Sequence, residues 1–212
     1  MSLAILFGFG LVLSGIAIRI GIPLSHKLGV VDQPGGHKVH DHSTPFVGGI
    51  GVFVALMGTL ALSGAMPNMD SSAVQWQAVA LGATVMFVTG LVDDIHHLSF
   101  RIRFVIQAGV ALVMVLGGGV VLSDLGYLAF GHKLELGFLA IPFTIFATVG
   151  VINALNMIDG IDGLSGSVSL VTLFLLTLVA FSGGAYGYAV LAVGVLGGVA
   201  GFLYFNMRYW SH

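Results

Sequence analysis

Residues 164–182 read LSGSVSLVTLFLLTLVAFS and contain no charged side chain. A helix of about 20 apolar residues is long enough to cross the roughly 30 Å hydrocarbon core of a bilayer. The chain contains further segments of this length and character: 2–23, 45–64, 73–92, 103–122, 138–157 and 186–205. We expect helices rather than a β-barrel, because barrel strands are about ten residues long and alternate between apolar and polar side chains.

The composition agrees with a membrane protein. Of the 212 residues, 57% are hydrophobic and 8% are charged, and the mean hydropathy is +1.05. Soluble domains carry about 25% charged residues. The sequence therefore predicts an all-α, polytopic integral membrane helix bundle of about seven transmembrane helices, forming one transmembrane domain over residues 1–212. The net charge of −2 and the lack of a basic stripe argue against a nucleic-acid partner, and without cysteine there is no disulfide framework.

The basic residues predict the orientation in the membrane. Seven spans place loops 24–44, 93–102 and 158–163 on one side, together with the tail from residue 206. The first side holds five basic residues, if Arg103 at the very start of a span is counted with its loop: Lys27, Lys38, Arg101, Arg103 and Arg208. The opposite side holds only Lys133. Because positively charged loops stay in the cytoplasm, we expect this side to be cytoplasmic and the N-terminus to be external.

Acidic residues also gather on the predicted cytoplasmic side. Six of the nine lie there: Asp32, Asp41, Asp93, Asp94, Asp159 and Asp162. The opposite connection, 123–137, alternates apolar and polar residues over short stretches, which predicts a small hairpin at the membrane surface. Polar chemistry from three distant loops is thus expected at one membrane face.

The first cytoplasmic loop reads DQPGGHKVH over residues 32–40. Its glycines allow the backbone to approach a ligand closely, and Lys38 and His40 offer hydrogen-bond donors to phosphate. The alternative is an ordinary positively charged loop with a Pro-Gly turn.

Two adjacent carboxylates, Asp93 and Asp94, end the third span. They repel each other and face the negative end of the helix dipole, so a bound cation would stabilise them. Mg²⁺ is the natural candidate, because it takes carboxylate oxygens and leaves positions for water and substrate phosphates. Alternatively, Arg101 and Arg103 neutralise the pair as a structural ion cluster.

The third motif is NALNMIDGIDGL, residues 153–164. Asn153, Asn156, Asp159 and Asp162 follow one another at intervals of three, which on a helix places them along one face. Polar groups inside or beside an apolar span are costly unless a ligand or their neighbours satisfy them. The alternative to a ligand site is a helix-breaking turn whose amides and carboxylates satisfy one another.

These three motifs, in this order and at these span ends, resemble those of the polyprenyl-phosphate N-acetylhexosamine-1-phosphate transferases. The segment DDIHHLSFRIR, residues 93–103, is more similar to the bacterial undecaprenyl-phosphate GlcNAc-1-phosphate transferases than to the MurNAc-pentapeptide translocases, which carry a lysine soon after the acidic pair. His37 stands where an arginine is usual. Family members have ten or eleven spans, and this sequence stops at His212, where a Gly-Asp-x-Gly-Ser loop is expected to begin. The resemblance therefore implies the N-terminal part of such an enzyme.

The resemblance implies a reaction and a place for it. A phosphate oxygen of polyprenyl phosphate attacks the β-phosphorus of a UDP-sugar, GlcNAc-1-phosphate is transferred and UMP leaves. The reaction takes place at the cytoplasmic face of the bacterial inner membrane and starts cell-envelope polysaccharide synthesis, such as that of lipopolysaccharide. Mg²⁺, or alternatively Mn²⁺, would lie at Asp93 and Asp94. The resemblance implies four catalytic residues: Asp93, Asp94, Asp159 and Asp162. It also implies four substrate-binding residues: Lys38, His40, Asn153 and Asn156.

Two other interpretations remain open at this stage. An ion-coupled transporter would use the acidic residues as a cation site, although transporters place such sites near the bilayer midplane, on broken helices in paired repeats. A catalytically inactive fragment or subunit is the other alternative. A homodimer is also compatible with the sequence.

Overall fold

The computed structural model describes most of the chain: residues 2–28, 31–32, 44–45, 47–64, 73–127, 131–161 and 163–207. Helices dominate these residues: α1 (Leu3–Leu28), α2 (Gly48–Gly64), α3 (Ala73–His96), α4 (Phe100–Leu116), α5 (Ala140–Ile158), α6 (Leu164–Ser182) and α7 (Tyr186–Asn206). A 3-10 turn, η1 (Gly137–Leu139), leads into α5, and the strands β1 (Val31–Asp32) and β2 (Thr44–Pro45) have two residues each.

Each expected span contains one helix, which confirms the all-α, polytopic membrane fold. Among the described residues, five helices are long and apolar enough to cross a membrane: α1, α3, α5, α6 and α7. The helices α2 and α4 have 17 residues each, or about 25 Å at 1.5 Å per residue. The helix α4 ends at Leu116 instead of at residue 122, because three glycines follow and Gly119 adopts a left-handed conformation with φ 64°.

By its internal contacts the chain divides into two compact units. The first unit comprises Met1–Ser71 with Ile158–His212, and the second comprises Ser72–Met157. The first contains α1, α2, α6 and α7, and the second contains α3, α4 and nearly all of α5. The expectation of one transmembrane domain stays a prediction.

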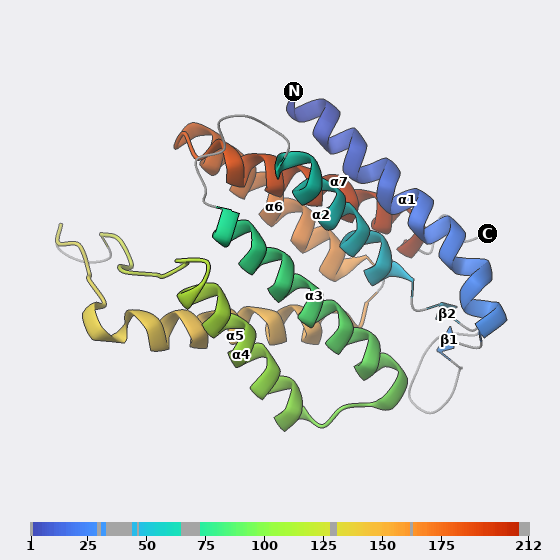
Figure 1. The fold of residues 1–212 in the computed structure, drawn as a ribbon, viewed down its shortest axis with the longest axis horizontal. Coiled ribbons are helices and arrows are strands. Elements are labelled where there is room, and N and C mark those ends of the chain that lie inside the picture. The colour runs from blue at the N-terminus through green and yellow to red at the C-terminus, as the bar shows by residue number, and fades with distance from the viewer. Residues whose placement is uncertain are drawn as a thin grey trace. The chain divides into compact units, whose positions relative to one another are not determined.

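The helix α7 lies at the centre of the first unit. Half of its apolar window is buried, against 22% for α1 and 11% for α6. It runs parallel to α1, since Gly10 meets Gly194 and, further along both helices, Ser14 meets Gly201 (Figure 1). It runs antiparallel to α2, whose side chains Thr59 and Ala55 contact Gly194 and Gly198 in turn.

Glycine makes this close packing possible. A Cβ atom on Gly10 would overlap the carbonyl oxygen of Gly194, and one on Gly197 would overlap that of Phe7. The backbones of α1 and α7 therefore touch directly, as small residues permit between membrane helices, where dispersion contacts replace the hydrophobic effect as the driving force. The interfaces of α7 with α1 and with α2 also bury small hydroxyl residues, Ser14 and Thr59 respectively. The hydroxyl of Thr59 donates a hydrogen bond to the carbonyl of Ala55 at 2.7 Å.

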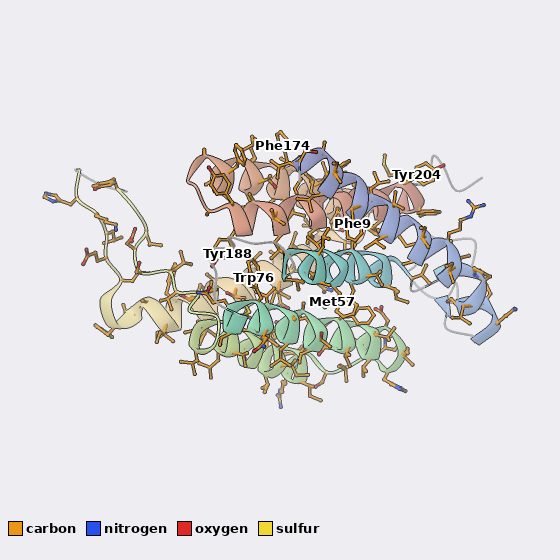
Figure 2. The ribbon with its side chains drawn as sticks, turned by 45° about the horizontal axis from the view of Figure 1, so that its top comes forward. Phe9, Met57, Trp76, Phe174, Tyr188 and Tyr204 are labelled. Atoms are coloured by element: carbon orange, nitrogen blue, oxygen red, sulfur yellow. The ribbon has the colours of Figure 1, made fainter. Side chains whose placement is uncertain are left out.

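Large apolar side chains cover the outside of the helices. Along the helices in Figure 2 the sticks are mostly carbon. The labelled Phe174 of α6 and Tyr204 of α7 are 50% and 58% exposed. An aqueous surface would not tolerate apolar area on this scale, whereas lipid does.

In the second unit, α3 and α4 form an antiparallel helical hairpin. Gly82 of α3 packs against Val110 of α4. After α4, the backbone N–H of Leu122 donates to the hydroxyl of Thr144 on α5 at 2.9 Å. This bond places the beginning of α5 beside the segment that follows α4.

The predicted hairpin between α4 and α5 is confirmed. Asp124 pairs with Glu135 in an antiparallel bridge, and the Lys133 ammonium lies 2.9 Å from the Asp124 carboxylate. This hydrogen bond holds the pKa of Asp124 below its usual 3.8 and raises that of Lys133 above 10.5. Stabilisation through Asp124 is lost only when the pH falls through its lowered pKa, and that through Lys133 only when the pH rises through its raised pKa. The ion pair therefore persists across the whole neutral range.

Within each unit, the helix ends that were expected on the cytoplasmic side lie together. In the first unit, Gly48 at the start of α2 packs against Phe202 near the end of α7. The backbone N–H of Gly163, just before α6, donates to the side chain of Asn206 at the end of α7. The strands β1 and β2 pair antiparallel, with Asp32 opposite Thr44, and so close the base of the first loop.

Candidate active site

The acidic pair lies in the last turn of α3. The backbone N–H of His97 donates to the carbonyl of Asp93 at 2.8 Å, and His97 itself takes a left-handed conformation with φ 50°. Such a residue ends a helix, and histidine tolerates this conformation better than most side chains. The carboxylates therefore stand where the helix dipole is negative, as the sequence predicts, and require positive charge nearby.

Arg103 of α4 supplies that charge. Its NH1 group donates to Asp93 Oδ2 at 2.8 Å, and the two side chains are 30% and 22% exposed. Arg101 instead lies over the ring of Phe100, 5.6 Å from its centre. Of the two arginines proposed to neutralise the pair, Arg103 alone does so in this geometry. The Nε of Arg103 is buried and has no hydrogen-bond partner among the described residues.

The donor chemistry of this pair fits Mg²⁺. One carboxylate oxygen of Asp93, Oδ2, accepts a hydrogen bond from Arg103, and the other oxygen does not take part in that bond. The Asp94 side chain is exposed. Mg²⁺ commonly takes one or two carboxylates and completes its shell with water and substrate phosphates. In the described part of the chain, no group of three or more His, Asp or Glu residues could hold a metal. A cation at Asp93 and Asp94 would therefore draw its remaining ligands from elsewhere.

Asn153 of α5 makes a bond that the sequence did not predict. Its amide nitrogen donates to the carbonyl of Val149 at 2.8 Å and to Oε1 of Gln107 on α4 at 2.6 Å. Asn153 is half-buried and Gln107 is 6% exposed. Asp93 and Asn153 thus both contact the first part of α4, through Arg103 and Gln107 respectively.

The helical spacing expected for the third motif holds only as far as Asn156. The helix α5 ends at Ile158, so Asp159 lies in a turn, and the prediction of one helical ridge through all four residues is wrong. The Asp-Gly pairs account for this end, because glycine is a poor helix former and Gly163 adopts a left-handed conformation with φ 77°. Asn156 is exposed on the last turn of α5.

Asp159 and its surroundings belong to the first unit. The hydroxyl of Ser165 on α6 donates to Asp159 Oδ1. At the foot of α6, the backbone N–H of Gly163 donates to Asn206 Oδ1 at 2.7 Å. The end of α7 therefore holds the turn that carries Asp159. The alternative considered from the sequence, a turn whose polar groups are hydrogen-bonded within the protein, is present in part.

Three of the predicted site residues, Lys38, His40 and Asp162, lie outside the described residues. The others fall into two groups. Asp93, Asp94, Asn153 and Asn156 are at one end of the second unit, and Asp159 is in the first unit. Their assignment to a catalytic site stays a prediction.

Sequence reasoning missed Gln107, Ser165 and Asn206. A signal for Gln107 exists, because it precedes the buried Ala111 and Val115 at intervals of four residues. A polar residue at a core position of an apolar helix needs a partner. Asn206 and Ser165 carry a weaker signal, since polar residues are common where a span ends.

Comparison with known sequences identifies the family of the chain. Residues 76–210 match the model of glycosyl transferase family 4. The chain is 34% identical over 198 residues to the probable undecaprenyl-phosphate N-acetylglucosaminyl 1-phosphate transferase of Bacillus subtilis (strain 168), covering 93% of this chain and 52% of that protein. It is 32% identical over 130 residues to the undecaprenyl-phosphate alpha-N-acetylglucosaminyl 1-phosphate transferase of Escherichia coli (strain K12), covering 61% and 34%.

The chain belongs to glycosyl transferase family 4, since the family match covers more than half of its residues. The resemblance found in the three motifs is thereby confirmed. The chain spans about half the length of the Bacillus subtilis relative and about a third of the Escherichia coli one. Membership of a transferase family favours an enzyme over the transporter alternative.

Proposed function

We propose that this protein transfers a sugar-1-phosphate, GlcNAc-1-phosphate by the names of its relatives, from a UDP-sugar to polyprenyl phosphate. The observation that carries the proposal is the grouping of Asp93, Asp94, Asn153 and Asn156 at one end of an apolar helical unit, in a chain of this family. A lipid phosphate can reach such a site from the bilayer and a nucleotide can reach it from water.

In this reaction an oxygen of the lipid phosphate forms a bond to the β-phosphorus of the donor. The bond from that phosphorus to the bridging oxygen breaks, and UMP leaves with the electron pair. Phosphoryl transfer depends on positioning and charge neutralisation more than on covalent chemistry by the protein. The exposed amide of Asn156 is available to the nucleotide or sugar, and Arg103 places a cationic side chain beside the acidic pair.

Asp93 and Asp94 would hold Mg²⁺, with Mn²⁺ as the alternative, and the bound ion would supply positive charge to the diphosphate. Asp159 and Asp162 follow α5 directly in the chain and are proposed to serve the same reaction, one of them by orienting or deprotonating the lipid phosphate. Lys38 and His40 are proposed to meet phosphate through the first loop.

The test is release of UMP by the purified protein given UDP-GlcNAc, undecaprenyl phosphate and Mg²⁺. We expect release that requires all three components and that stops when a chelator removes the metal. UDP-glucose and UDP-MurNAc-pentapeptide serve as alternative donors. If the protein binds lipid and nucleotide but releases no UMP under any donor, the proposal is wrong for this chain.

We further propose that the site faces the cytoplasm, that the N-terminus is external, and that the membrane is the bacterial inner membrane. The excess of basic residues in loops on one side supports this orientation. The natural absence of cysteine makes it easy to test, because single cysteines can be placed at Ser99, before α4, and at Ser123, after α4.

An impermeant maleimide added to right-side-out membrane vesicles is expected to label Ser123→Cys and to leave Ser99→Cys unlabelled until the vesicles are opened. Both serines are exposed, so that burial does not hide either thiol. The reverse pattern would show the opposite orientation, and labelling of both positions in sealed vesicles would show that α4 does not cross.

A further inference from the structure

Gln107 is buried inside an apolar helical unit, yet the proposed reaction gives it no role. It is 6% exposed and lies on the same face of α4 as the buried Ala111 and Val115. A buried amide costs free energy unless it is hydrogen-bonded, and an aliphatic side chain would fill this position at no such cost. Its bond to Asn153 therefore points to a role for the pair beyond packing.

The hydrogen bonds of Asn153 determine which way its carboxamide faces. The carbonyl of Val149 can only accept, so the nitrogen of Asn153 must be the atom beside it. The second hydrogen of this nitrogen goes to Gln107 Oε1 at 2.6 Å. Both donors are thus occupied, and among the described residues no hydrogen bond uses Asn153 Oδ1. What Asn153 can offer a ligand is an acceptor.

The same face of α4 contacts both neighbouring helices. Arg103, one turn before Gln107, bonds Asp93 of α3, and Gln107 bonds Asn153 of α5. Side chains four residues apart stack on one side of a helix. The first two turns of α4 thereby link a predicted metal-binding residue to a predicted substrate-binding residue.

We propose that Gln107 is a positioning residue for the transferase, acting through Asn153. Gln107 Oε1 holds the Asn153 nitrogen, so that Asn153 Oδ1 accepts a hydrogen bond from an O–H or N–H group of the nucleotide-sugar donor. This inference rests on the proposed function. A group that acts only by orienting Asn153 has no effect once the Asn153 side chain is gone.

A double-mutant cycle on the full protein tests this dependence. Gln107→Leu keeps the volume and loses the acceptor, and we expect it to lower kcat/KM for UDP-GlcNAc about tenfold, which is the cost of one buried donor left unpaired. Gln107→Glu keeps an oxygen toward Asn153 and is expected to recover most of that loss. In the Asn153→Ala background, Gln107→Leu is expected to change kcat/KM less than twofold.

The control is Thr144→Val. Thr144 is a buried polar residue of the same unit, 5% exposed, and it also bonds across to the segment after α4, at the far end of α5. This variant is expected to lower the melting temperature without changing kcat/KM. The inference is overturned if Gln107→Leu acts equally in both backgrounds, if it has no effect, or if Thr144→Val lowers kcat/KM as much.

A crosslinking arm separates this inference from the proposed function. In the cysteine-free chain, Gln107→Cys with Asn153→Cys is expected to be bridged by a short bifunctional methanethiosulfonate, whereas Gln107→Cys with Thr144→Cys is not. A protein that crosslinks but releases no UMP contradicts the proposed function alone. A protein that releases UMP but does not crosslink contradicts the role of Gln107.

Discussion

Asp93→Asn is expected to lower UMP release by roughly 10²- to 10³-fold or more, the range seen when one preorganised electrostatic contact to a transition state is removed. The substitution keeps the shape of the side chain and removes its charge. A neutral amide is a weak ligand for Mg²⁺, and it also leaves the Arg103 guanidinium without its carboxylate. Initial rates over a range of Mg²⁺ concentrations would measure the loss, and we expect added Mg²⁺ to restore little of it.

The matched control for this variant is Asp124→Asn. Asp124 also pairs with a cationic side chain, Lys133 at 2.9 Å, but lies in the hairpin between α4 and α5. Its replacement should leave the rate within about twofold of the unmodified protein, because a surface ion pair is worth little and touches no substrate. An Asp93→Asn protein that keeps more than half of the rate would remove Asp93 from the proposed metal site.

Gly10→Ala is expected to destabilise the protein more than any single methyl group added to the outside of its helices. The new Cβ would overlap the carbonyl oxygen of Gly194, so α1 and α7 would have to separate. Forcing a methyl group into a packed interface costs typically 1–3 kcal/mol, although alanine recovers about 1 kcal/mol through its better helix propensity. The atom in the way is a backbone oxygen, which cannot rotate away as a side chain can. We therefore expect a packing cost in the upper part of the 1–3 kcal/mol range, larger than the gain in helix propensity.

Gly8→Ala is the control, two residues earlier on the same helix. Nothing lies within 4 Å of a Cβ built on Gly8. The variant should therefore match or exceed the unmodified protein in melting temperature, measured by size-exclusion chromatography after heating in detergent. Equal melting temperatures for Gly8→Ala and Gly10→Ala would show that the backbones of α1 and α7 do not touch.

The pairing of Asp93 with Arg103 bears on the two interpretations of the acidic pair that the sequence left open, a Mg²⁺ site and a structural ion cluster. In the structure the acidic pair is partly neutralised by an arginine, as a structural ion cluster would be. Asp93 uses one carboxylate oxygen for Arg103, and its second oxygen is of the kind that suits Mg²⁺. Pairing with Arg103 is therefore compatible with the catalytic role proposed for this site.

The sequence by itself determined the helices and the motifs at their ends. Seven apolar segments of sufficient length predict seven helices. In lipid the backbone must satisfy its own hydrogen bonds, and a helix does so within one segment. The hairpin at 123–137 was also predictable, since alternation and turn residues are local signals. The motif at 153–164 was specific enough to indicate the family, which the family match then confirmed.

Contacts between segments that are far apart in sequence were decided by the tertiary structure alone. No spacing rule relates Gln107 to Asn153, 46 residues later, or Gly163 to Asn206, 43 residues later. The central position of α7 also depends on which face of each helix its glycines meet. Periodicity and composition describe one helix at a time, whereas these contacts depend on how two helix surfaces fit, and in lipid that fit is decided by the shapes of particular side chains rather than by apolarity.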